Sequence, residues 1–315
     1  MVLAIALWAV APVLARERSA PQTPEFAARL ELVHLVVNVE DRDGRPVPDL
    51  RAEDFVVRED GLPQSVSVCL RAADGEQSSR LDVDLALLLD VSGSMIENVQ
   101  LSRVAAMTFL DAVPRARDTL VVLFHHEIRG FRYRPEDREA TLRLIEGTEA
   151  GGGTALYDAI HGALTHLRTD SGREVIVLVS DGENLRSRIA VDDLFEEIRG
   201  SRATIYPILF SGPLLAKTSR RIAAETFLER IARMSGGEVF LPEGPKGIGE
   251  AFDRLLKELS SQYVLGFAPS NDRHDGAYRK LKVEVKRPKT KVRHREGYVA
   301  PKGEAPPPRV RPNGQ

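Results

Sequence analysis

Two patterns of hydrophobic and polar residues alternate along the chain. Between about residues 81 and 260, uninterrupted apolar runs are separated by segments whose apolar residues recur every three or four positions. An uninterrupted run is typical of a strand buried on both faces, and the recurrence is typical of an amphipathic helix. The predicted strands are 85–89, 120–124, 175–179 and 204–210, and the predicted helices are 101–112, 156–167, 191–199, 222–234 and 248–260. This alternation predicts an α/β domain with a doubly wound, mainly parallel sheet.

Short β-branched runs flank this region on both sides. They predict strands at 31–40, 55–57, 65–70, 263–267, 281–285 and 292–299. We therefore divide the chain into an N-terminal β segment (29–78), an α/β domain (80–260) and a C-terminal β segment (262–300). Because the two flanks share β character, we expect them to pack together as one small β domain, with the α/β domain inserted between them.

The N-terminal residues 1–15 have the character of a secretory signal. They contain no charged side chain and end Val13-Leu14-Ala15 before a polar linker at 16–28. The run is shorter than the ~20 apolar residues of a membrane-spanning helix. It predicts an exported protein, periplasmic or extracellular, with an uncleaved anchor as the alternative and no stable membrane span after cleavage. Residues 301–315 are proline-rich and predict a disordered tail.

Composition excludes some kinds of partner and some sources of stability. The 315 residues include 44 basic and 46 acidic side chains, for a net charge of −2. This balance argues against a nucleic-acid-binding protein. Cys69 is the single cysteine, so the chain has no internal disulfide and no cysteine-rich zinc site. Stability must come from packed cores, and we interpret Cys69 as a small core residue.

The strongest local charge feature is the basic segment 279–295, with nine Lys or Arg residues and one Glu. It has two interpretations, a patch for anionic polymers or lipid headgroups and a β-hairpin with a wet, lysine-rich edge. The alternation of Lys280-Leu281-Lys282-Val283 favours the hairpin.

Polar residues that could bind a ligand lie where the first and third predicted buried strands end. The first strand runs into Asp90, Ser92 and Ser94, and the third into Asp181, while Thr154 follows three glycines before a predicted helix. In open α/β sheets, ligands bind at the carboxyl ends of the strands. If the loop after Asp90 is extended, its three polar side chains point the same way. Carboxylate and hydroxyl oxygens are the ligands that hard cations prefer, and two carboxylates roughly neutralise a divalent ion.

These three segments together resemble the von Willebrand factor type A domain and its metal-ion-dependent adhesion site. All five motif positions have their counterparts here, at Asp90, Ser92, Ser94, Thr154 and Asp181. The resemblance implies a bound Mg²⁺, with Mn²⁺ or Ca²⁺ as substitutes, and one coordination position left for a Glu or Asp of a partner protein. Further segments resemble bacterial exported proteins called VWFA-related, common in acidobacteria. These are the flanks 47–61 and 262–266 and the core segment 153–158.

Other interpretations of the same residues stay open. Asp90, Ser92 and Ser94 alone also suit a helix N-cap with a turn. Asp158, Glu97 and Glu183 lie near the motif and are interpreted mainly as solvated surface, with contact to the site as the alternative. The histidines His125, His126, His161 and His166 have no spaced metal-binding partner and are interpreted as surface or packing residues.

Taken together, the sequence predicts a protein-binding module rather than an enzyme. The predicted metal would clamp an acidic side chain of a partner, and it would serve recognition rather than folding. One alternative is a cytoplasmic or periplasmic partner of an AAA+ ATPase, a role of some type A domains. Another is a metal-dependent hydrolase, which the sequence favours less because it has no evident nucleophile elbow, paired catalytic carboxylates or Cys-His pair.

Overall fold

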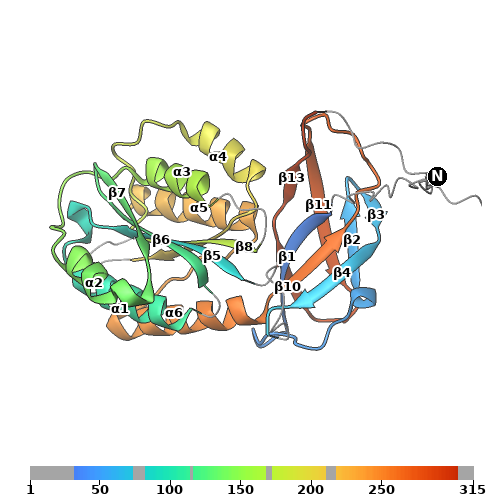
Figure 1. The fold of residues 1–315 in the computed structure, drawn as a ribbon, viewed down its shortest axis with the longest axis horizontal. Helices are drawn as coiled ribbons and strands as arrows, with labels where there is room; N and C mark the ends of the chain where they lie inside the picture. Colours follow the sequence, from blue (N-terminus) through green and yellow to red (C-terminus); the bar gives the residue numbers. More distant parts are fainter. Residues whose placement is uncertain (1–31, 74–81, 114–115, 168–171, 211–217, 304–315) are drawn as a thin grey trace, which may run out of the picture.

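The computed structural model describes residues 32–73, 82–113, 116–167, 172–210 and 218–303. The predicted signal peptide, the linker and nearly all of the predicted tail lie outside the described residues. The described residues form one mixed sheet covered by helices and, beside it, two antiparallel sheets (Figure 1). No helix among them has the length and apolar character needed to span a membrane.

The central sheet has five strands, four of them parallel. In spatial order they are β7 (Ile128–Tyr133), β6 (Ala116–Phe124), β5 (Val83–Asp90), β8 (Arg173–Ser180) and β9 (Thr204–Leu209). β7 runs antiparallel to β6 at one edge. Every residue of β5 and β8 is buried, as expected of strands covered on both faces. The predicted mainly parallel, doubly wound α/β class is confirmed.

Helices cover both faces of this sheet (Figure 1). One face carries α1 (Val99–Ala112), α2 (Arg138–Glu146) and α6 (Gly244–Ser261); the other carries α3 (Leu156–His166), α4 (Val191–Gly200) and α5 (Ser219–Ser235). Alternate residues of β5 divide between the two cores, with Leu85 and Leu87 facing α1 and α6, and Ala86 and Leu88 facing α3, α4 and α5. The domain is thus a three-layer sandwich with two buried cores.

β7 and α2 were not predicted. Most of β7 is exposed, and α2 buries only Thr141 and Ile145, so neither segment has a strong apolar pattern. Pro207, inside the strand predicted at 204–210, lies within β9 at the other edge of the sheet. Edge strands tolerate proline because the strand needs ladder bonds on one side only.

Strands from both ends of the chain make the two antiparallel sheets. One sheet has the order β12 (Lys291–His294), β1 (Val33–Glu40), β10 (Tyr263–Phe267) and β4 (Val66–Arg71). The other has the order β13 (Gly297–Val299), β11 (Tyr278–Val285), β2 (Phe55–Glu59) and β3 (Leu62–Gln64). They share a third core that includes Leu35, Val57 and Leu265. Both sheets therefore combine N-terminal and C-terminal strands.

The prediction of one strand over 292–299 was wrong. The segment forms β12 and β13, which belong to different sheets. The chain bends between them at Arg295 and Glu296, where the Glu296 N–H donates to Met234 O at 3.1 Å and Arg295 Nη2 donates to His34 O at 2.9 Å. These bonds hold the crossover against α5 and β1.

The nine basic side chains of segment 279–295 differ in burial. Arg279 is buried, Arg293 and Arg295 are half-buried, and the other six are exposed. Arg279 is buried and bonds Asp275, while Lys280 and Lys282 alternate with buried residues on β11. This pattern agrees with a strand that has one wet face, and it accounts for Lys280 and Lys282 without an anionic ligand.

Candidate metal site at the carboxyl end of the central sheet

The central strand β5 is the topological switch point of the sheet. Its connection to β6 leads to one side, and β8 pairs with its other side. Asp90 is the last residue of β5, and Ser180 is the last residue of β8. The crevice at such a point is where open α/β sheets place their ligands.

Asp90 is a buried carboxylate held by neutral donors. It is 1% exposed. Oδ1 accepts from the Ser92 N–H at 2.9 Å, and Oδ2 accepts from the Ser180 hydroxyl at 2.6 Å. Burial raises the pKa of Asp90 to about 7, the two serines oppose that rise, and the nearby charge of Asp181 adds to it. A buried carboxylate with a second carboxylate nearby favours a cation, so the donor set fits a divalent ion.

Ser92 and Ser94 approach each other, with their Oγ atoms 3.2 Å apart. The sequence allows an extended chain here, but Gly93–Met95 form a single 3₁₀ turn, η3. The Met95 N–H donates to Ser92 O at 3.1 Å, and the buried Met95 side chain anchors this turn in the core. Asp90, Ser92 and Ser94 do not cap α1, whose N-cap residue is Asn98. The cap-and-turn interpretation therefore holds only for η3, whose N-cap residue is Ser92, without a side-chain cap bond.

Backbone hydrogen bonds join the first of the three predicted segments to the second. The Gly93 N–H donates to Gly152 O at 3.1 Å, and the Gly151 N–H donates to Val91 O at 2.9 Å. A Cβ on Gly93 would lie 3.3 Å from Gly152 O, so glycine permits this close approach. The loop that carries Thr154 therefore lies directly against the loop that carries Ser92 and Ser94.

Hydrogen bonds also join the third segment, which carries Asp181, to the other two segments. Thr154 O accepts from the Leu185 and Arg186 N–H groups at 2.8 and 2.9 Å, which joins the loop after Asp181 to the second segment. Ser180 bonds Asp90, which joins β8 to the first. Thr154 is 1% exposed, and Asp181 is half-buried with its Oδ1 accepting from the Glu183 N–H at 3.1 Å. The structure thus brings together the segments that carry all five sequence-predicted residues.

Asn184 and Ser187, which are not among the sequence-predicted site residues, hold this arrangement. The Ser187 hydroxyl accepts from the Tyr157 N–H at 2.9 Å and from the Asp158 N–H at 3.3 Å, and Asn184 Oδ1 accepts from the Leu156 N–H at 3.1 Å. Loop 184–189 therefore caps α3 from outside the helix. A serine or asparagine in a loop carries no local signal for a helix that it caps from a distance.

Asp158 of α3 in turn bonds the loop that caps the helix. Its carboxylate accepts from the backbone N–H groups of Arg188 and Ile189 at 2.9–3.1 Å. The preference for solvated surface at Asp158 was therefore wrong, since this side chain fixes the loop that follows Asp181. Its position in the first turn of α3 was the available signal, because a helix N-terminus favours a carboxylate.

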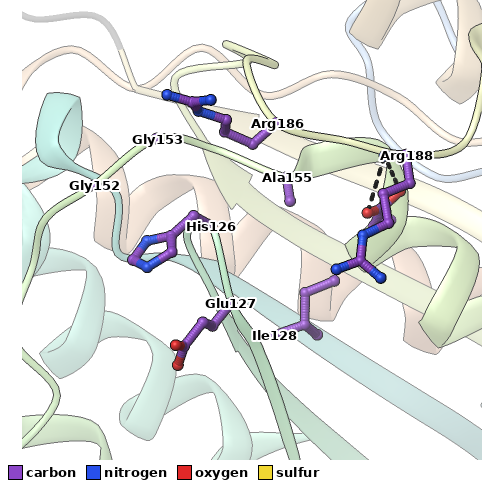
Figure 2. Close-up of a pocket in the computed structure, with 9 residues that line it drawn as sticks. His126, Glu127, Ile128, Gly152, Gly153, Ala155, Arg186 and Arg188 are labelled. Carbon is purple, nitrogen blue, oxygen red and sulfur yellow. Dashed lines mark hydrogen bonds between the residues drawn. The ribbon is translucent and has the colours of Figure 1, made fainter.

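A pocket of about 870 Å³ opens beside the glycine loop. Figure 2 shows its side chains around the opening, with His126 beside Gly152 and Arg186 above Gly153. Gly152 has φ +74°, and a Cβ there would clash with His126; a Cβ on Gly153 would lie 2.8 Å from Arg186 Cγ. The two glycines leave room for these two side chains. His126 is an exposed residue whose ring stacks on that of His125, with the centroids 4.2 Å apart.

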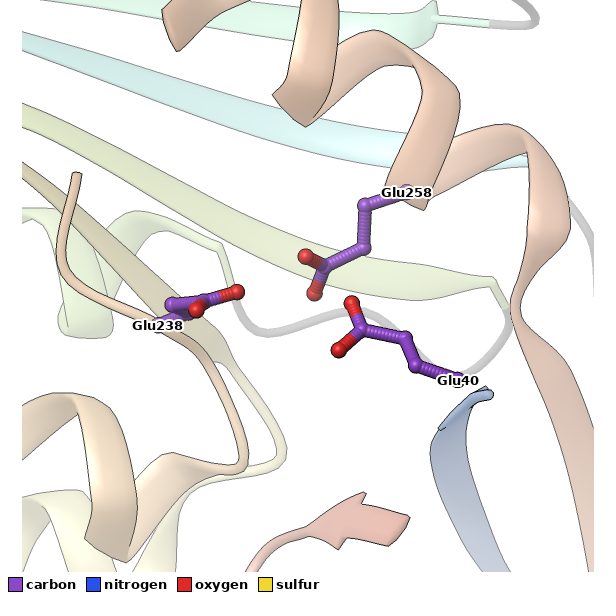
Figure 3. Close-up of side chains that lie close together, drawn as sticks. All are labelled: Glu40, Glu238 and Glu258. Carbon is purple, nitrogen blue, oxygen red and sulfur yellow. The ribbon is translucent and has the colours of Figure 1, made fainter. Parts of the chain in front are cut away.

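The described residues contain one further group of three acidic side chains, Glu40, Glu238 and Glu258 (Figure 3). Arg293 Nη2 lies 3.0, 3.1 and 2.9 Å from their respective carboxylate oxygens. The guanidinium thus occupies the place of a cation, and this cluster is an ion-pair network rather than a metal site.

One known protein family matches part of the chain. Residues 85–183 match the model of the von Willebrand factor type A domain. No curated protein sequence matches the chain. A similar solved structure is a von Willebrand factor type A protein from Catenulispora acidiphila, 14% identical with a TM-score of 0.48, covering 88% of this chain and 76% of that one.

Two other similar structures have adhesive or matrix roles in their names. The pilus adhesin SpaC from Lactobacillus rhamnosus GG is 8% identical, with a TM-score of 0.46 over 81% of this chain and 49% of that one. Proximal thread matrix protein 1 from the mussel byssus, with a zinc-occupied MIDAS motif, is 17% identical, with a TM-score of 0.46 over 62% of this chain and 48% of that one. This chain spans about half the length of each. All five predicted site residues lie within residues 85–183, the part of the chain that matches the von Willebrand factor type A domain.

Proposed function

We propose that this protein is a metal-dependent binding module for other proteins, with Asp90, Ser92, Ser94, Thr154 and Asp181 as the metal-binding residues. The observation that carries the proposal is the buried Asp90 carboxylate, which is bonded only to neutral donors and lies near a second carboxylate. The preferred ion is Mg²⁺, with Mn²⁺ or Ca²⁺ as substitutes, because every ligand in the set is a hard oxygen.

The five residues would contribute two kinds of ligand oxygen to such an ion. Asp90 and Asp181 supply negative charge, whereas Ser92, Ser94 and Thr154 supply neutral oxygens. When bound, the ion supplies a positive charge that attracts a carboxylate. Because two carboxylates balance a divalent ion without adding excess negative charge, a Glu or Asp of a partner protein remains attracted to it.

Exposed apolar side chains near the site favour a protein as the partner. Ile96, Ile128 and Leu185 are 58, 41 and 60% exposed. Ile96 follows η3, Leu185 donates its N–H to Thr154 O, and Ile128 lines the adjacent pocket. Exposed apolar side chains beside a polar anchor are a common composition of protein-binding surfaces.

Metal titration of the full-length protein tests the proposed ligands. We expect Mg²⁺ to bind wild type by titration calorimetry, and Ser94→Ala and Asp181→Asn to weaken binding at least about tenfold, since each removes a ligand or a charge. Glu97→Gln is the matched control, because Glu97 is an exposed acidic side chain three residues after Ser94. Equal Mg²⁺ affinity in wild type and both site variants would contradict the proposed site.

Partner capture tests the function itself. We expect immobilised protein to retain partners in Mg²⁺ and to release them in EDTA, with mass spectrometry to identify what is released. The Ser94→Ala variant should capture none of the EDTA-released proteins. If the same proteins stay bound in EDTA and on Ser94→Ala, a metal-independent scaffold replaces the proposed mechanism.

We further propose that the protein acts outside the cytoplasm. The apolar run at 1–15 supports export. Sequencing of the mature N-terminus tests this proposal. A chain that begins near Arg16 is expected, and it would exclude a cytoplasmic partner of an AAA+ ATPase, whereas an intact cytosolic N-terminus would favour that alternative.

A further inference from the structure

The pocket beside the glycine loop carries two arginine side chains that the fold does not use. Among the described residues, neither Arg186 nor Arg188 forms an ion pair or a side-chain hydrogen bond, and both are exposed. Several other arginines of the described residues are paired with carboxylates, as Arg138 is with Asp111 at 2.8 Å. Two free guanidinium groups at one pocket are therefore available to a ligand.

The acidic side chains of the same pocket are already engaged. Glu127 lies 3.1 Å from Arg129, and that hydrogen bond holds the pKa of Glu127 below its usual value. Both oxygens of Asp158 accept backbone N–H groups from Arg188 and Ile189. Arg129, Arg186 and Arg188 outnumber the carboxylates of Glu127 and Asp158 by one charge, so the pocket presents a net attraction for an anion.

The arginines of the pocket are also attached to the segments of the predicted metal site. Arg186 donates its backbone N–H to Thr154 O at 2.9 Å, and its aliphatic stem lies against Gly153, the residue before Thr154. Arg188 is fixed through its backbone by Asp158 in α3 (Figure 2). The two guanidinium groups are thus carried by a loop that is bonded to the segment bearing Thr154.

We infer that this pocket binds a second acidic side chain of the partner, with Arg186 and Arg188 as its cationic ligands. The naming of the partner as a protein rests on the proposed function, while the anion-binding role of the pocket does not. A guanidinium binds a carboxylate through two parallel hydrogen bonds. The partner recognised by this face is therefore an acidic segment with at least two carboxylates, one at the predicted metal and one at the arginines.

Two fluorescent peptides test the inference on the full-length protein at low ionic strength. One is decaglutamate, which offers every spacing between two carboxylates, and the other is a Gly-Ser peptide of equal length with a single central Glu. We expect Arg186→Gln/Arg188→Gln to weaken decaglutamate binding at least about tenfold by fluorescence anisotropy. Binding of the single-glutamate peptide in Mg²⁺ should change less than about twofold.

The matched control is Arg42→Gln/Arg134→Gln. Both of these arginines are exposed, Arg42 in the turn after β1 and Arg134 beyond the end of β7 that pairs with the start of β6. This variant loses the same two charges far from the pocket. If it weakens decaglutamate binding as much as the pocket variant does, or if the pocket variant weakens both peptides equally, the inference is overturned.

A repeat in EDTA separates this inference from the proposed function. Residual decaglutamate binding in EDTA should still depend on Arg186 and Arg188, since the arginines need no metal. Single-glutamate binding that is unchanged by EDTA would remove the metal-dependent function and leave the arginine pocket standing. Metal-dependent single-glutamate binding, together with decaglutamate binding that ignores both arginines in Mg²⁺ and in EDTA, would remove only the inference.

Discussion

Gly152 and Gly153 shape the candidate site through the side chains they lack. Gly152 has φ +74°, a conformation that other residues adopt at a cost, and its open side gives room to His126. Gly153 lies under the stem of Arg186. Gly151 has neither feature, because nothing lies within 4 Å of a Cβ placed there. Three consecutive glycines therefore have different roles.

Alanine substitutions along this loop should separate those roles. We expect Gly152→Ala to lower the free energy of unfolding by about 1–2 kcal/mol, since it combines a left-handed conformation with a clash against His126. Gly151→Ala should change it by less than about 0.5 kcal/mol. Urea denaturation of the two variants measures the difference, and equal stabilities would show that the loop tolerates a Cβ at both positions.

The residues of the candidate site were predictable only in part. Asp90 and Asp181 follow buried strands in the sequence, so their convergence at one sheet edge could be predicted from strand order alone. Ser180 could not be selected as a partner of Asp90, because its hydroxyl joins two strands that are 90 residues apart. The roles of the five predicted residues as metal ligands stay a prediction until metal binding is measured.

At the scale of elements, helix α3 depends on a loop outside it. Its N-cap residue, Ala155, offers no side-chain cap, and loop 184–189 supplies one through Asn184 and Ser187. Sequence patterns located α3 and the buried strands well, because their apolar residues repeat strongly. They missed β7 and α2, whose burial is slight, and the break at 295–296, whose cause is a contact with α5.

Removal of the external cap should destabilise the domain. Ser187→Ala leaves the Tyr157 and Asp158 N–H groups without their acceptor, so we expect a loss of about 1–2 kcal/mol in the free energy of unfolding. Thr226→Ala is the control, because the Thr226 hydroxyl bonds Ile222 O within the exposed face of α5. Comparable losses in both variants would argue against a special role for the loop as a cap.

At the scale of the whole molecule, Arg293 joins the antiparallel sheets to the α/β domain. It extends from β12 to Glu40 of β1, to Glu258 of α6 and to Glu238 in the loop after α5. Sequence predicted strands in both flanks, and the structure pairs β1 with β10 and with β12. The limits 29–78, 80–260 and 262–300 remain a proposal for domain boundaries. A single arginine among three distant glutamates has no sequence signal, because its partners are brought together only by the fold.

Arg293→Met should therefore destabilise the molecule, and more so at higher pH. Burial raises the pKa of Glu258 above the ordinary 4.5, and Arg293 opposes that rise. A carboxyl whose pKa is raised on folding favours the native state at low pH, and that advantage is lost as pH increases through the native-state pKa. Without Arg293 the pKa rises further, because Glu238 and Glu40 remain close. We expect a loss of about 3 kcal/mol at pH 8 and a smaller loss at pH 5, measured by urea denaturation.

Lys291→Met removes an exposed charge 3.9 Å from the same Glu238 and should cost less than about 1 kcal/mol at both pH values. A pH-independent loss in Arg293→Met would show that the arginine acts through packing of its stem rather than through its charge.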